Sequence, residues 1–136
     1  MYAANGIGLA AIQIGIPKRI IVMDISKGEE KKNPLYFVNP VIKNKNTELS
    51  TYEEGCLSVP NYFAEIDRPK KCDVEYLDYN GQKKVLNAEG LLATCIQHEM
   101  DHLEGILFID YLSKLKKTMI IKKLSKQKEK PDRIIV

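Results

Sequence analysis

The chain has 136 residues, of which 44% are hydrophobic and 29% are charged. This length and composition fit one globular domain with a single core, and they exclude a disordered chain, a collagen-like repeat and a coiled coil. No apolar run reaches the roughly 18 residues that a membrane helix needs, and the first residues lack the layout of a signal peptide, so we expect a cytoplasmic protein without a membrane contact.

The charge is divided unevenly along the chain. Residues 1–112 hold 12 basic and 16 acidic side chains, whereas residues 113–136 hold 9 basic and 2 acidic ones. The two segments therefore carry net charges of −4 and +7, and we treat them as the main part and the basic C-terminal helix and tail of one domain.

The first expected elements are a turn and two strands. The glycine-rich, apolar residues 6–11 are typical of a buried turn in which the backbone comes close to a neighbouring group. Segments 19–25 and 35–42 are rich in β-branched and aromatic residues, which favours strands, and the polar segment 28–33 between them is typical of a loop.

A hairpin and a helix follow. Alternating residues from 73 to 88 flank Asn80-Gly81, which predicts a hairpin with a two-residue turn because both residue types tolerate a positive φ. Residues 91–103 then change to helical periodicity, and Gly105 is well placed to end that helix. The residues that share one stripe of this helix are Leu91, Cys95, His98 and His102.

A second helix is expected from about Tyr111, with lysines around one apolar face. The residues of that face are Leu112, Leu115, Met119 and Leu124. Strands that precede helices, without alternation of the two, predict an α+β fold.

The segment His98-Glu99-Met100-Asp101-His102 carries the strongest chemical signal. Histidines at positions i and i+4 of a helix present both imidazoles on one side, where they can share one metal ion. Glu99 lies beside them, where a carboxylate can accept a proton from water activated by the metal. These two histidines are the only ones in the chain, so a chance arrangement is disfavoured.

A catalytic site of this type needs a third protein ligand. A metzincin would have a histidine at position 108, where this chain has Phe108. A thermolysin-like site would need a downstream glutamate, and the nearest is Glu129 in the lysine-rich tail. Both classes therefore fit poorly.

A cysteine thiolate is the remaining candidate. Three cysteines without an export signal indicate free thiols or metal ligands. Cys95 is seven residues from His102, about 10.5 Å along a helix, so we interpret it as a wall of the pocket. Cys72 reads as a half-buried strand residue. Cys56 follows Gly55, which permits a close approach to a ligand, and it is our third ligand.

Gln13 is the one side-chain amide of the opening segment. The segment lacks the third glycine and the lysine of phosphate-binding loops. If it lies beside the metal, the amide of Gln13 could donate to an oxyanion; otherwise Gln13 is an ordinary surface residue.

Three segments together resemble the peptide deformylases. That family carries G-x-G-x-A-A-x-Q, E-G-C-L-S and H-E-x-D-H in this order, and the chain has them at 6–13, 54–58 and 98–102. The resemblance runs from about Met1 to Leu112. It implies a catalytic part over residues 1–112, with antiparallel strands and a β-hairpin packed around a central metal-binding helix, followed by the C-terminal amphipathic helix.

The resemblance also implies roles for individual residues. Cys56, His98 and His102 would bind the metal, and Glu99 would act as general base and then as general acid on the formyl group of N-formylmethionyl peptides. The side chain of Gln13 and the backbone N–H of Leu57 would stabilise the oxyanion. The residues implied to hold the peptide and its methionine are Ile7, Gly8, Gly55, Leu91, Thr94, Cys95 and His98. Glu54 and Arg68 resemble an ion pair that supports the metal-binding segment.

The implied cofactor is one divalent metal ion. The family resemblance favours Fe²⁺ as the physiological ion, with Zn²⁺, Ni²⁺ or Co²⁺ able to substitute, and imidazole and thiolate ligands suit both iron and zinc. The implied products are formate and a peptide with a free N-terminus.

The basic segment 113–136 has two interpretations. It is either an amphipathic helix with solvated lysines, or a contact for ribosomal RNA, which the family resemblance supports. Family members carry several dozen residues before the first motif, so we expect either a natural short form or a sequence that begins at an internal methionine. A partner subunit that covers the exposed surface is one hypothesis for the oligomeric state.

Two other classes remain open. Another metallohydrolase, such as a short zinc peptidase, would share His98, Glu99 and His102 but would give no reason for Cys56 or Gln13. A non-enzymatic module with a structural metal and an RNA-binding tail would need a closed site of four protein ligands, and the sequence offers three.

Overall fold

The computed structural model describes residues 1–26 and 31–128. Its elements in chain order are η1 (Tyr2–Ala4), β1 (Gly8–Ala10), η2 (Ala11–Ile14), β2 (Ile20–Met23), β3 (Leu35–Lys43), β4 (Leu49–Cys56), β5 (Val59–Pro69), β6 (Lys71–Leu77), β7 (Lys83–Glu89), α1 (Leu91–Leu103), η3 (Phe108–Tyr111) and α2 (Lys114–Lys128).

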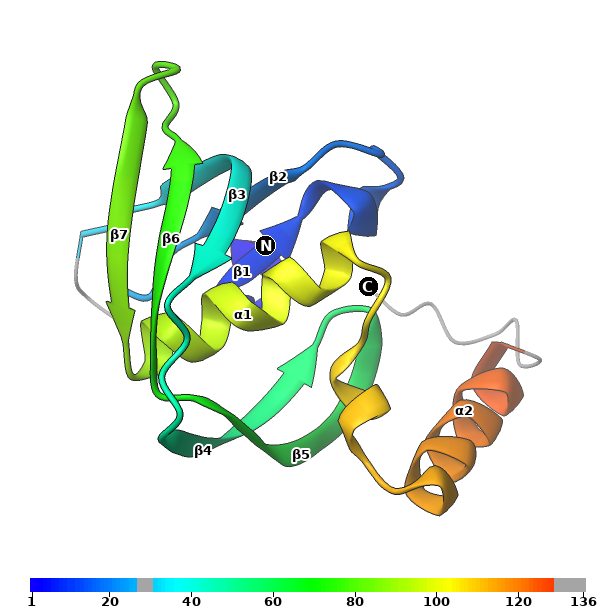
Figure 1. Cartoon of the computed structure of the whole chain (residues 1–136). Helices are drawn as coiled ribbons and strands as arrows, with labels where there is room; N and C mark the ends of the chain where they lie inside the picture. The colour runs from blue at the N-terminus through cyan, green and yellow to red at the C-terminus, as the bar shows by residue number, and fades with distance from the viewer. Residues whose placement is uncertain (27–30, 129–136) are drawn as a thin grey trace.

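The strands form two antiparallel sheets with α1 between them (Figure 1). Five strands make one sheet in the order β1-β2-β3-β6-β7, and β4 pairs with β5 in a separate two-stranded sheet. This arrangement confirms the predicted α+β class, with antiparallel strands packed around one central helix. It also corrects the prediction for residues 6–11, because residues 8–10 form an edge strand rather than part of a turn.

The core has two parts, one on each side of α1. Ala93 and Ile96 face the five-stranded sheet, where they join a cluster that includes Ile21 and Phe37, and all four are fully buried. The second cluster lies between β5 and η3 and consists of Val59, Ile66, Phe108 and Ile109. Because apolar side chains cover α1 from both sides, its polar residues are also removed from water.

The predicted bounds of α1 are confirmed at residues 91–103. The helix ends in a Schellman motif, in which Gly105 has a φ of +73°. The N–H of Gly105 donates to the carbonyl of His102 (3.1 Å), and the N–H of Ile106 donates to that of Asp101 (2.8 Å). Only glycine adopts this backbone conformation without a steric cost, which is why Gly105 fixes the helix end.

The hairpin of β6 and β7 is confirmed, but the predicted two-residue turn is wrong. Only Gly81 has a positive φ (+77°), and the N–H of Asp78 donates to the carbonyl of Gln82 (2.9 Å), so residues 79–81 form a three-residue loop. The Asp78 carboxylate accepts the backbone N–H groups of Asn80 and Gln82, each at 2.9 Å. These two bonds stabilise the longer loop and explain the difference.

The second helix begins later than predicted. Residues 108–111 form the separate 3₁₀ turn η3, and α2 begins at Lys114. The Ser113 side chain accepts the backbone N–H of Lys116 at 3.3 Å, as a residue just before a helix commonly does.

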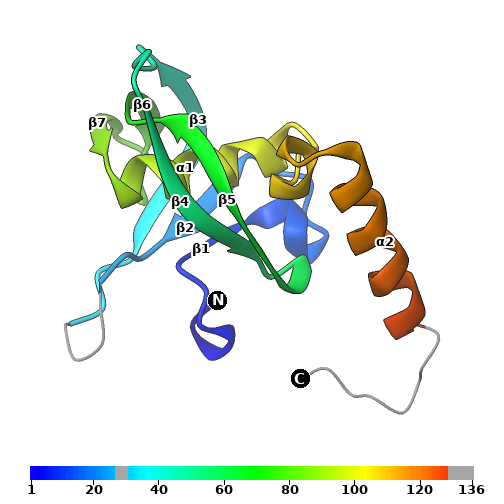
Figure 2. The ribbon, with the colours of Figure 1, turned by 90° about the horizontal axis from the view of Figure 1, so that it is seen from below.

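Two of the four residues predicted for the apolar face of α2 are packed against the core, and the prediction is wrong for the other two. Leu112 and Leu124 do pack on the second cluster, together with Ile120, whereas Leu115 and Met119 are 72% and 49% exposed. The helix stands apart from both sheets (Figure 2), and it touches the rest of the protein through η3 along one narrow face. A narrow contact buries only one row of side chains, so the neighbouring row remains in water.

Two predictions fall partly outside the described residues. Of the predicted loop 28–33, residues 31–33 are irregular as expected, and 28–30 are not described. Of the basic segment, residues 129–136 are likewise not described. Among the helices that are described, none has the length and apolar character needed to cross a membrane.

Candidate active site

Three side chains of the kinds that bind metals come together between α1 and the β4–β5 sheet. They are the thiol of Cys56, at the end of β4, and the imidazoles of His98 and His102 on α1. One candidate ligand atom from each lies within 4.8 Å of the others, and Cys56 Sγ is 3.2 Å from His102 Nε2. A tetrahedral ion with bonds of roughly 2.0–2.3 Å separates its ligands by about 3.5 Å, which this spacing can accommodate.

An irregularity in the β4–β5 pairing brings Cys56 to this place. The register shifts between Gly55, which pairs with Phe63, and Cys56, which pairs with Val59 across a tight turn. Such a shift changes the direction of a side chain at the end of a strand. A Cβ on Gly55 would lie 2.5 Å from the ring of Phe63, so only glycine allows this close packing beside the cysteine.

The thiol of Cys56 has the chemistry of a ligand. Burial alone would raise its pKa, but hydrogen bonds with His102 and His98 outweigh that effect, and the backbone N–H of Ser58 adds to them. Together they lower the pKa of Cys56 to about 5. The thiolate, which is the form that binds metals and reacts with electrophiles, therefore prevails at neutral pH.

A buried carboxylate orients the first histidine. Nδ1 of His98 lies 2.8 Å from Oε1 of Glu54, so the other ring nitrogen, Nε2, is left for the cluster. Glu54 is 6% exposed, and Arg68 donates to both of its oxygens, from Nε at 2.7 Å and from Nη2 at 3.0 Å. This bidentate pair holds the carboxylate in place.

The same guanidinium connects to a second acidic residue, which sequence reasoning did not identify. Arg68 Nη1 donates to Asp101 Oδ2 at 2.8 Å, and the Tyr111 hydroxyl donates to the same oxygen at 2.7 Å. The ring of Tyr111 also stacks 4.8 Å from the guanidinium carbon. The position of Asp101 next to His102 was the available signal, since residues beside metal ligands commonly support them.

Glu99 lies at the inner end of the site and is 4% exposed. Burial raises the pKa of its carboxyl to about 7, although His98 and His102 act in the opposite direction. Its Oε2 atom has no hydrogen-bond partner among the described residues. A Cβ on Gly8 would lie 2.8 Å from Glu99 Oε1, so this glycine allows β1 to approach the carboxylate.

Gln13 reaches the cluster from η2. Its Nε2 lies 3.6 Å from Cys56 Sγ and 2.9 Å from Ser58 Oγ, and its Oε1 accepts the N–H of Ala10 at 2.8 Å. The bond from Ala10 fixes the amide orientation, with the donor side toward the cluster. Leu57 follows Cys56 in the turn between the strands and lines the adjoining cavity.

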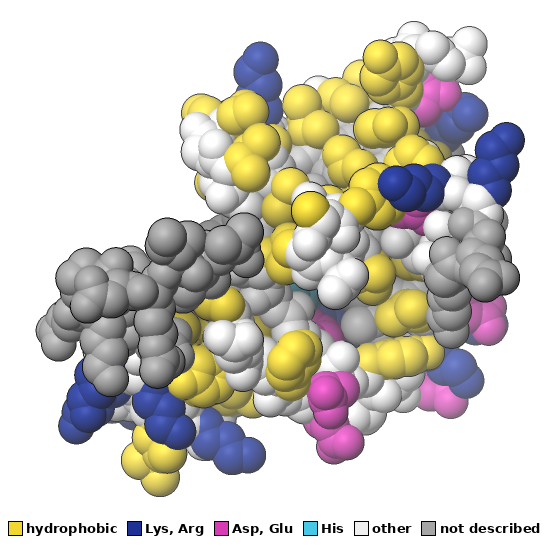
Figure 3. Space-filling view, turned by 180° about the vertical axis from the view of Figure 1, so that it is seen from behind, with side chains coloured by type: hydrophobic (Ala, Val, Ile, Leu, Met, Phe, Trp, Pro, Cys, Tyr) yellow, Lys and Arg dark blue, Asp and Glu magenta, His cyan; other side chains and the backbone are white. Residues whose placement is uncertain are grey.

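A cavity of about 860 Å³ opens beside the cluster. On the face shown in Figure 3 it forms a hollow, with a histidine at its floor and mainly hydrophobic side chains around it. All seven residues predicted to hold the substrate line it: Ile7, Gly8, Gly55, Leu91, Thr94, Cys95 and His98. A cavity with mainly apolar walls and a few convergent polar groups is typical of a small-molecule or peptide site.

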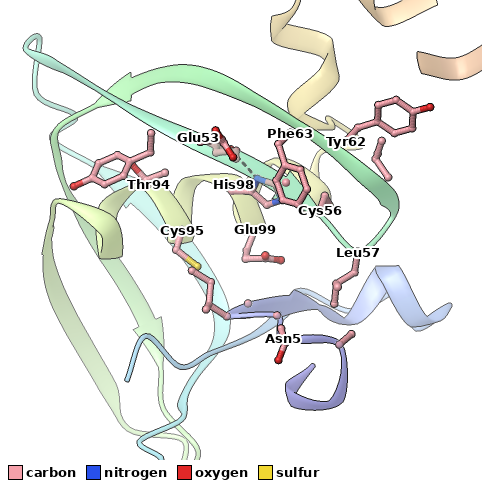
Figure 4. A pocket seen from close by; sticks show the side chains of 18 of the residues that line it. Asn5, Glu53, Cys56, Leu57, Tyr62, Phe63, Thr94, Cys95, His98 and Glu99 are labelled. Carbon is pink, nitrogen blue, oxygen red and sulfur yellow. Dashed lines mark hydrogen bonds and ion pairs between the residues drawn. The ribbon is translucent and has the colours of Figure 1, made fainter. Parts of the chain in front are cut away.

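Sequence reasoning missed other parts of this cavity. Asn5 lies on the side of the N-terminal segment, opposite Phe63 from β5, which is 68% exposed (Figure 4). Tyr62 also lines the cavity. The pairing of Phe63 with Gly55 would have revealed these residues, but the sequence analysis did not identify β4 and β5 as strands.

The residues present fit a metal ion. Two imidazoles and a thiol of lowered pKa form a soft donor set that suits zinc or ferrous iron. The Oε2 atom of Glu99, which has no partner in the part of the chain that the structure describes, adjoins the same space, where a polar ligand could satisfy it.

Comparison with known proteins agrees with this arrangement. The sequence model of the family described as polypeptide deformylase matches residues 1–118. The peptide deformylase of Pelagibacter ubique is 79% identical over 136 residues, which are 100% of this chain and 78% of that protein.

Solved structures are also similar. The crystal structure of peptide deformylase from Ehrlichia chaffeensis has a TM-score of 0.88 at 43% identity, and the match covers 95% of this chain and 77% of that one. The same organism's enzyme in complex with actinonin has a TM-score of 0.85 at 46% identity, with 93% and 76% covered.

The buried ion pair generates a prediction for stability. Replacement of Arg68 by Met should lower the free energy of unfolding by about 3–5 kcal/mol, because it leaves the carboxylate of Glu54 buried without its partner. Chemical denaturation followed by circular dichroism measures the change. The control is Arg19→Met, which removes an exposed ion pair with Glu104 and should cost less than about 1 kcal/mol. Similar small losses in both variants would contradict this assignment.

The thiols generate a prediction for reactivity. In protein treated with a chelator, iodoacetamide at pH 7 should modify Cys56 first, because its pKa of about 5 leaves it as thiolate. Below pH 5 the rate should fall about tenfold per pH unit as the thiolate is protonated. Burial raises the pKa of both Cys72 and Cys95, so they should remain unmodified. Mass spectrometry of tryptic peptides, with Cys56→Ser as the control, measures this order, and equal labelling of Cys72 would refute it.

Proposed function

The chain belongs to the polypeptide deformylase family, whose members are hydrolases that remove formyl groups, and we propose that it acts on the N-terminal formylmethionine of nascent peptides in the cytoplasm. The observation that carries this proposal is the convergence of Cys56, His98 and His102 on one point beside the buried carboxylate of Glu99. A thiolate lies at the floor of an apolar cavity beside a carboxylate whose Oε2 atom has no hydrogen-bond partner among the described residues. This arrangement suits hydrolysis rather than a closed structural metal.

Cys56, His98 and His102 would hold one divalent metal ion. When bound, such an ion supplies Lewis acidity, which lowers the pKa of water and polarises the formyl carbonyl. Fe²⁺ is the ion we propose for the physiological enzyme, with Zn²⁺, Ni²⁺ or Co²⁺ as substitutes, since the donor set suits each of them. Glu54 and Arg68 would keep His98 in the required tautomer.

Glu99 would transfer the protons of the reaction. A general base works best when its pKa is close to the working pH, and burial raises the pKa of Glu99 to about 7. Its carboxylate would take a proton from the attacking water and deliver it to the amine nitrogen as the C–N bond of the formamide breaks. The water oxygen is retained in formate, and the peptide leaves with a free amino group.

Gln13 and Leu57 would stabilise the charge that develops on the formyl oxygen. The amide nitrogen of Gln13 is 3.6 Å from Cys56 Sγ, so it can reach an oxygen held beside the cluster. We assign the backbone N–H of Leu57 the same role, because Leu57 directly follows Cys56 in the turn. Two donors fixed before the reaction stabilise a transition state without reorganisation.

The peptide would bind as an extended strand between β1 and β4. Ile7 lies just before the edge strand β1, and Gly55 is on the opposite wall. The carbonyl of Ile7 accepts the N–H of Asp24, so the N–H of Ile7 and the backbone of Gly55 are the groups that can be offered to a peptide. The methionine side chain would occupy the apolar part of the cavity, lined by Leu91, Thr94 and Cys95. This assignment explains why the cavity combines apolar walls with a polar floor.

The competing classes explain less of the site. A short zinc peptidase would use His98, Glu99 and His102, but it would not require the thiolate of Cys56 or the amide of Gln13. A structural module would have no use for the buried carboxylate of Glu99.

The whole proposed active site lies within residues 1–112. For the basic segment 113–136 we propose a contact with ribosomal RNA. Exposed lysines surround α2, and they are Lys114, Lys116, Lys122, Lys123 and Lys126. Contacts with phosphates need such solvent-facing ammonium groups.

The proposed chemistry predicts the behaviour of Glu99→Gln. With Fe²⁺ and without oxygen, the unmodified protein should release formate from formyl-Met-Ala-Ser, and Glu99→Gln should lower kcat/KM by at least about 10³-fold because the proton acceptor is lost. Metal content by inductively coupled plasma mass spectrometry should stay near one ion per chain.

Two results would count against the mechanism. Activity of Glu99→Gln near that of the unmodified protein would exclude Glu99 as the base. Loss of the metal along with the activity would assign Glu99 to metal binding instead. Cys56→Ser is the comparison variant, in which metal content should fall.

The ribosome contact predicts a dependence on salt and charge. The double variant Lys122→Glu with Lys123→Glu should co-sediment less with ribosomes, and the salt dependence of its binding should be weaker, because fewer counterions are released. The control carries Lys18→Glu with Lys83→Glu, which makes the same charge change outside α2. Equal sedimentation of the two double variants would refute a contact through α2.

A further inference from the structure

A second buried carboxylate lies outside the site described above. Asp24 directly follows β2 and is 3% exposed. Its Oδ1 accepts the backbone N–H of Ser26 at 2.9 Å and the Ser26 hydroxyl at 2.6 Å. Its Oδ2 accepts the N–H of Asn33 at 3.0 Å and the hydroxyl of Tyr2 at 2.5 Å. The two oxygens offer about four acceptor positions, and these four donors use all of them.

Asp24 also holds the N-terminal segment at a second point. Its backbone N–H donates to the carbonyl of Ile7 at 2.9 Å. Between Tyr2 and Ile7 the chain folds back on itself through η1, with Asn5 at a φ of +56° and the N–H of Gly6 donating to the carbonyl of Met1 at 3.0 Å. Residues 2–7 therefore form a short loop whose two ends, Tyr2 and Ile7, are both hydrogen-bonded to Asp24.

This loop forms one wall of the cavity. Residues 4–7 line it, and Figure 4 shows Asn5 on the side opposite Phe63. From Gly8 onward the chain is held by pairing with β2, where Gly8 faces Met23. Residues 4–7 precede that pairing, so their place depends on η1 and on the contacts with Asp24.

We infer that Asp24 and Tyr2 are positioning residues for peptide binding, because their contacts fix the position of the cavity wall formed by residues 4–7. The inference rests on the proposed function, in which Ile7 offers its backbone N–H to the peptide. The proposed metal ligands and Glu99 are on β4 and α1, and the proposed oxyanion donors Gln13 and Leu57 are on η2 and in the β4–β5 turn, so no residue assigned to the chemistry lies in this wall. Binding and turnover should therefore respond differently to its displacement.

The contact is stable at neutral pH. Hydrogen bonds from Ser26 and Tyr2 lower the pKa of Asp24 to about 2, and the bond to Asp24 raises the pKa of Tyr2 to about 12. The ammonium of Lys32 lies 4.4 Å from the centre of the Tyr2 ring and covers it. The tyrosine is thus held by its hydroxyl and by its ring.

Tyr2→Phe removes the hydroxyl and keeps the ring. With formyl-Met-Ala-Ser as substrate, we expect KM to rise by about fivefold to tenfold, which the loss of one hydrogen bond to a charged group can produce. We expect kcat to stay within about twofold and the metal content to be unchanged. Tyr79→Phe is the matched control, since Tyr79 is a surface tyrosine, 79% exposed, in the loop of the β6–β7 hairpin, and its KM should equal that of the unmodified protein.

A binding measurement keeps the inference testable without turnover. In the Glu99→Gln background, calorimetric titration with formyl-Met-Ala-Ser should give a Kd that rises by the same factor when Tyr2→Phe is added. An unchanged KM and Kd in Tyr2→Phe would overturn the inference, whether or not the melting temperature falls. A lower kcat at unchanged KM would also overturn it. Failure of the unmodified protein to release formate would instead refute the proposed function, and the titration would still decide the role of Tyr2.

Discussion

The contact of Arg68 with Glu54 and Asp101 is the interaction on which the site depends. Three charged groups lie together in a region where Arg68 and Glu54 have side chains that are 4% and 5% exposed. Charges removed from water at such a cost persist only when hydrogen bonds satisfy them, and here each guanidinium nitrogen has an acidic partner. The result joins β5 to β4 and to α1. Because β4 carries Cys56 and α1 carries both histidines, the same contact brings the donor atoms together.

The site is built from strands and from the helix α1, and glycines allow the close contacts between these elements. Gly8 lets an edge strand approach the carboxylate of Glu99, and Gly55 lets the ring of Phe63 cover the strand beside Cys56. A methyl group at either place would overlap existing atoms, at 2.8 Å and 2.5 Å. Replacement would force the side chain of Glu99 or the ring of Phe63 to move, and the carboxylate of Glu99 would then leave the position that the proposed proton transfer needs. Gly8 and Gly55 therefore contribute to the site because they have no Cβ atom, which leaves room for Glu99 and for Phe63.

Local signals in the sequence were enough for some elements and not for others. The bounds of α1 follow from its periodicity and from Gly105, because a Schellman motif is set by neighbours in the chain. The turn at Asn80-Gly81 could not be predicted from that dipeptide, since the carboxylate of Asp78 stabilises a longer loop. The sequence analysis did not predict the pairing of β4 with β5, because that pairing depends on contacts between residues of two strands rather than on a local pattern in either one. The contacts of Asp101 and Tyr111 with Arg68 depend likewise on the packing of three elements, α1, η3 and β5, and the position of Asp101 next to His102 was the one signal in the sequence.

The arrangement separates what performs chemistry from what binds the peptide. The proposed ligands and base lie on a buried helix and at the end of one hairpin, both held by the Arg68 contacts, so their spacing is fixed by the core. The opposite wall is a loop of residues 4–7 held by contacts with Asp24, and Ala4, Asn5 and Ile7 in it are exposed. A wall of this kind can change its sequence and position without disturbing the ligand distances. Peptide preference and turnover can therefore vary independently, since the first depends on local contacts of a loop and the second on buried charge pairs that tolerate little change.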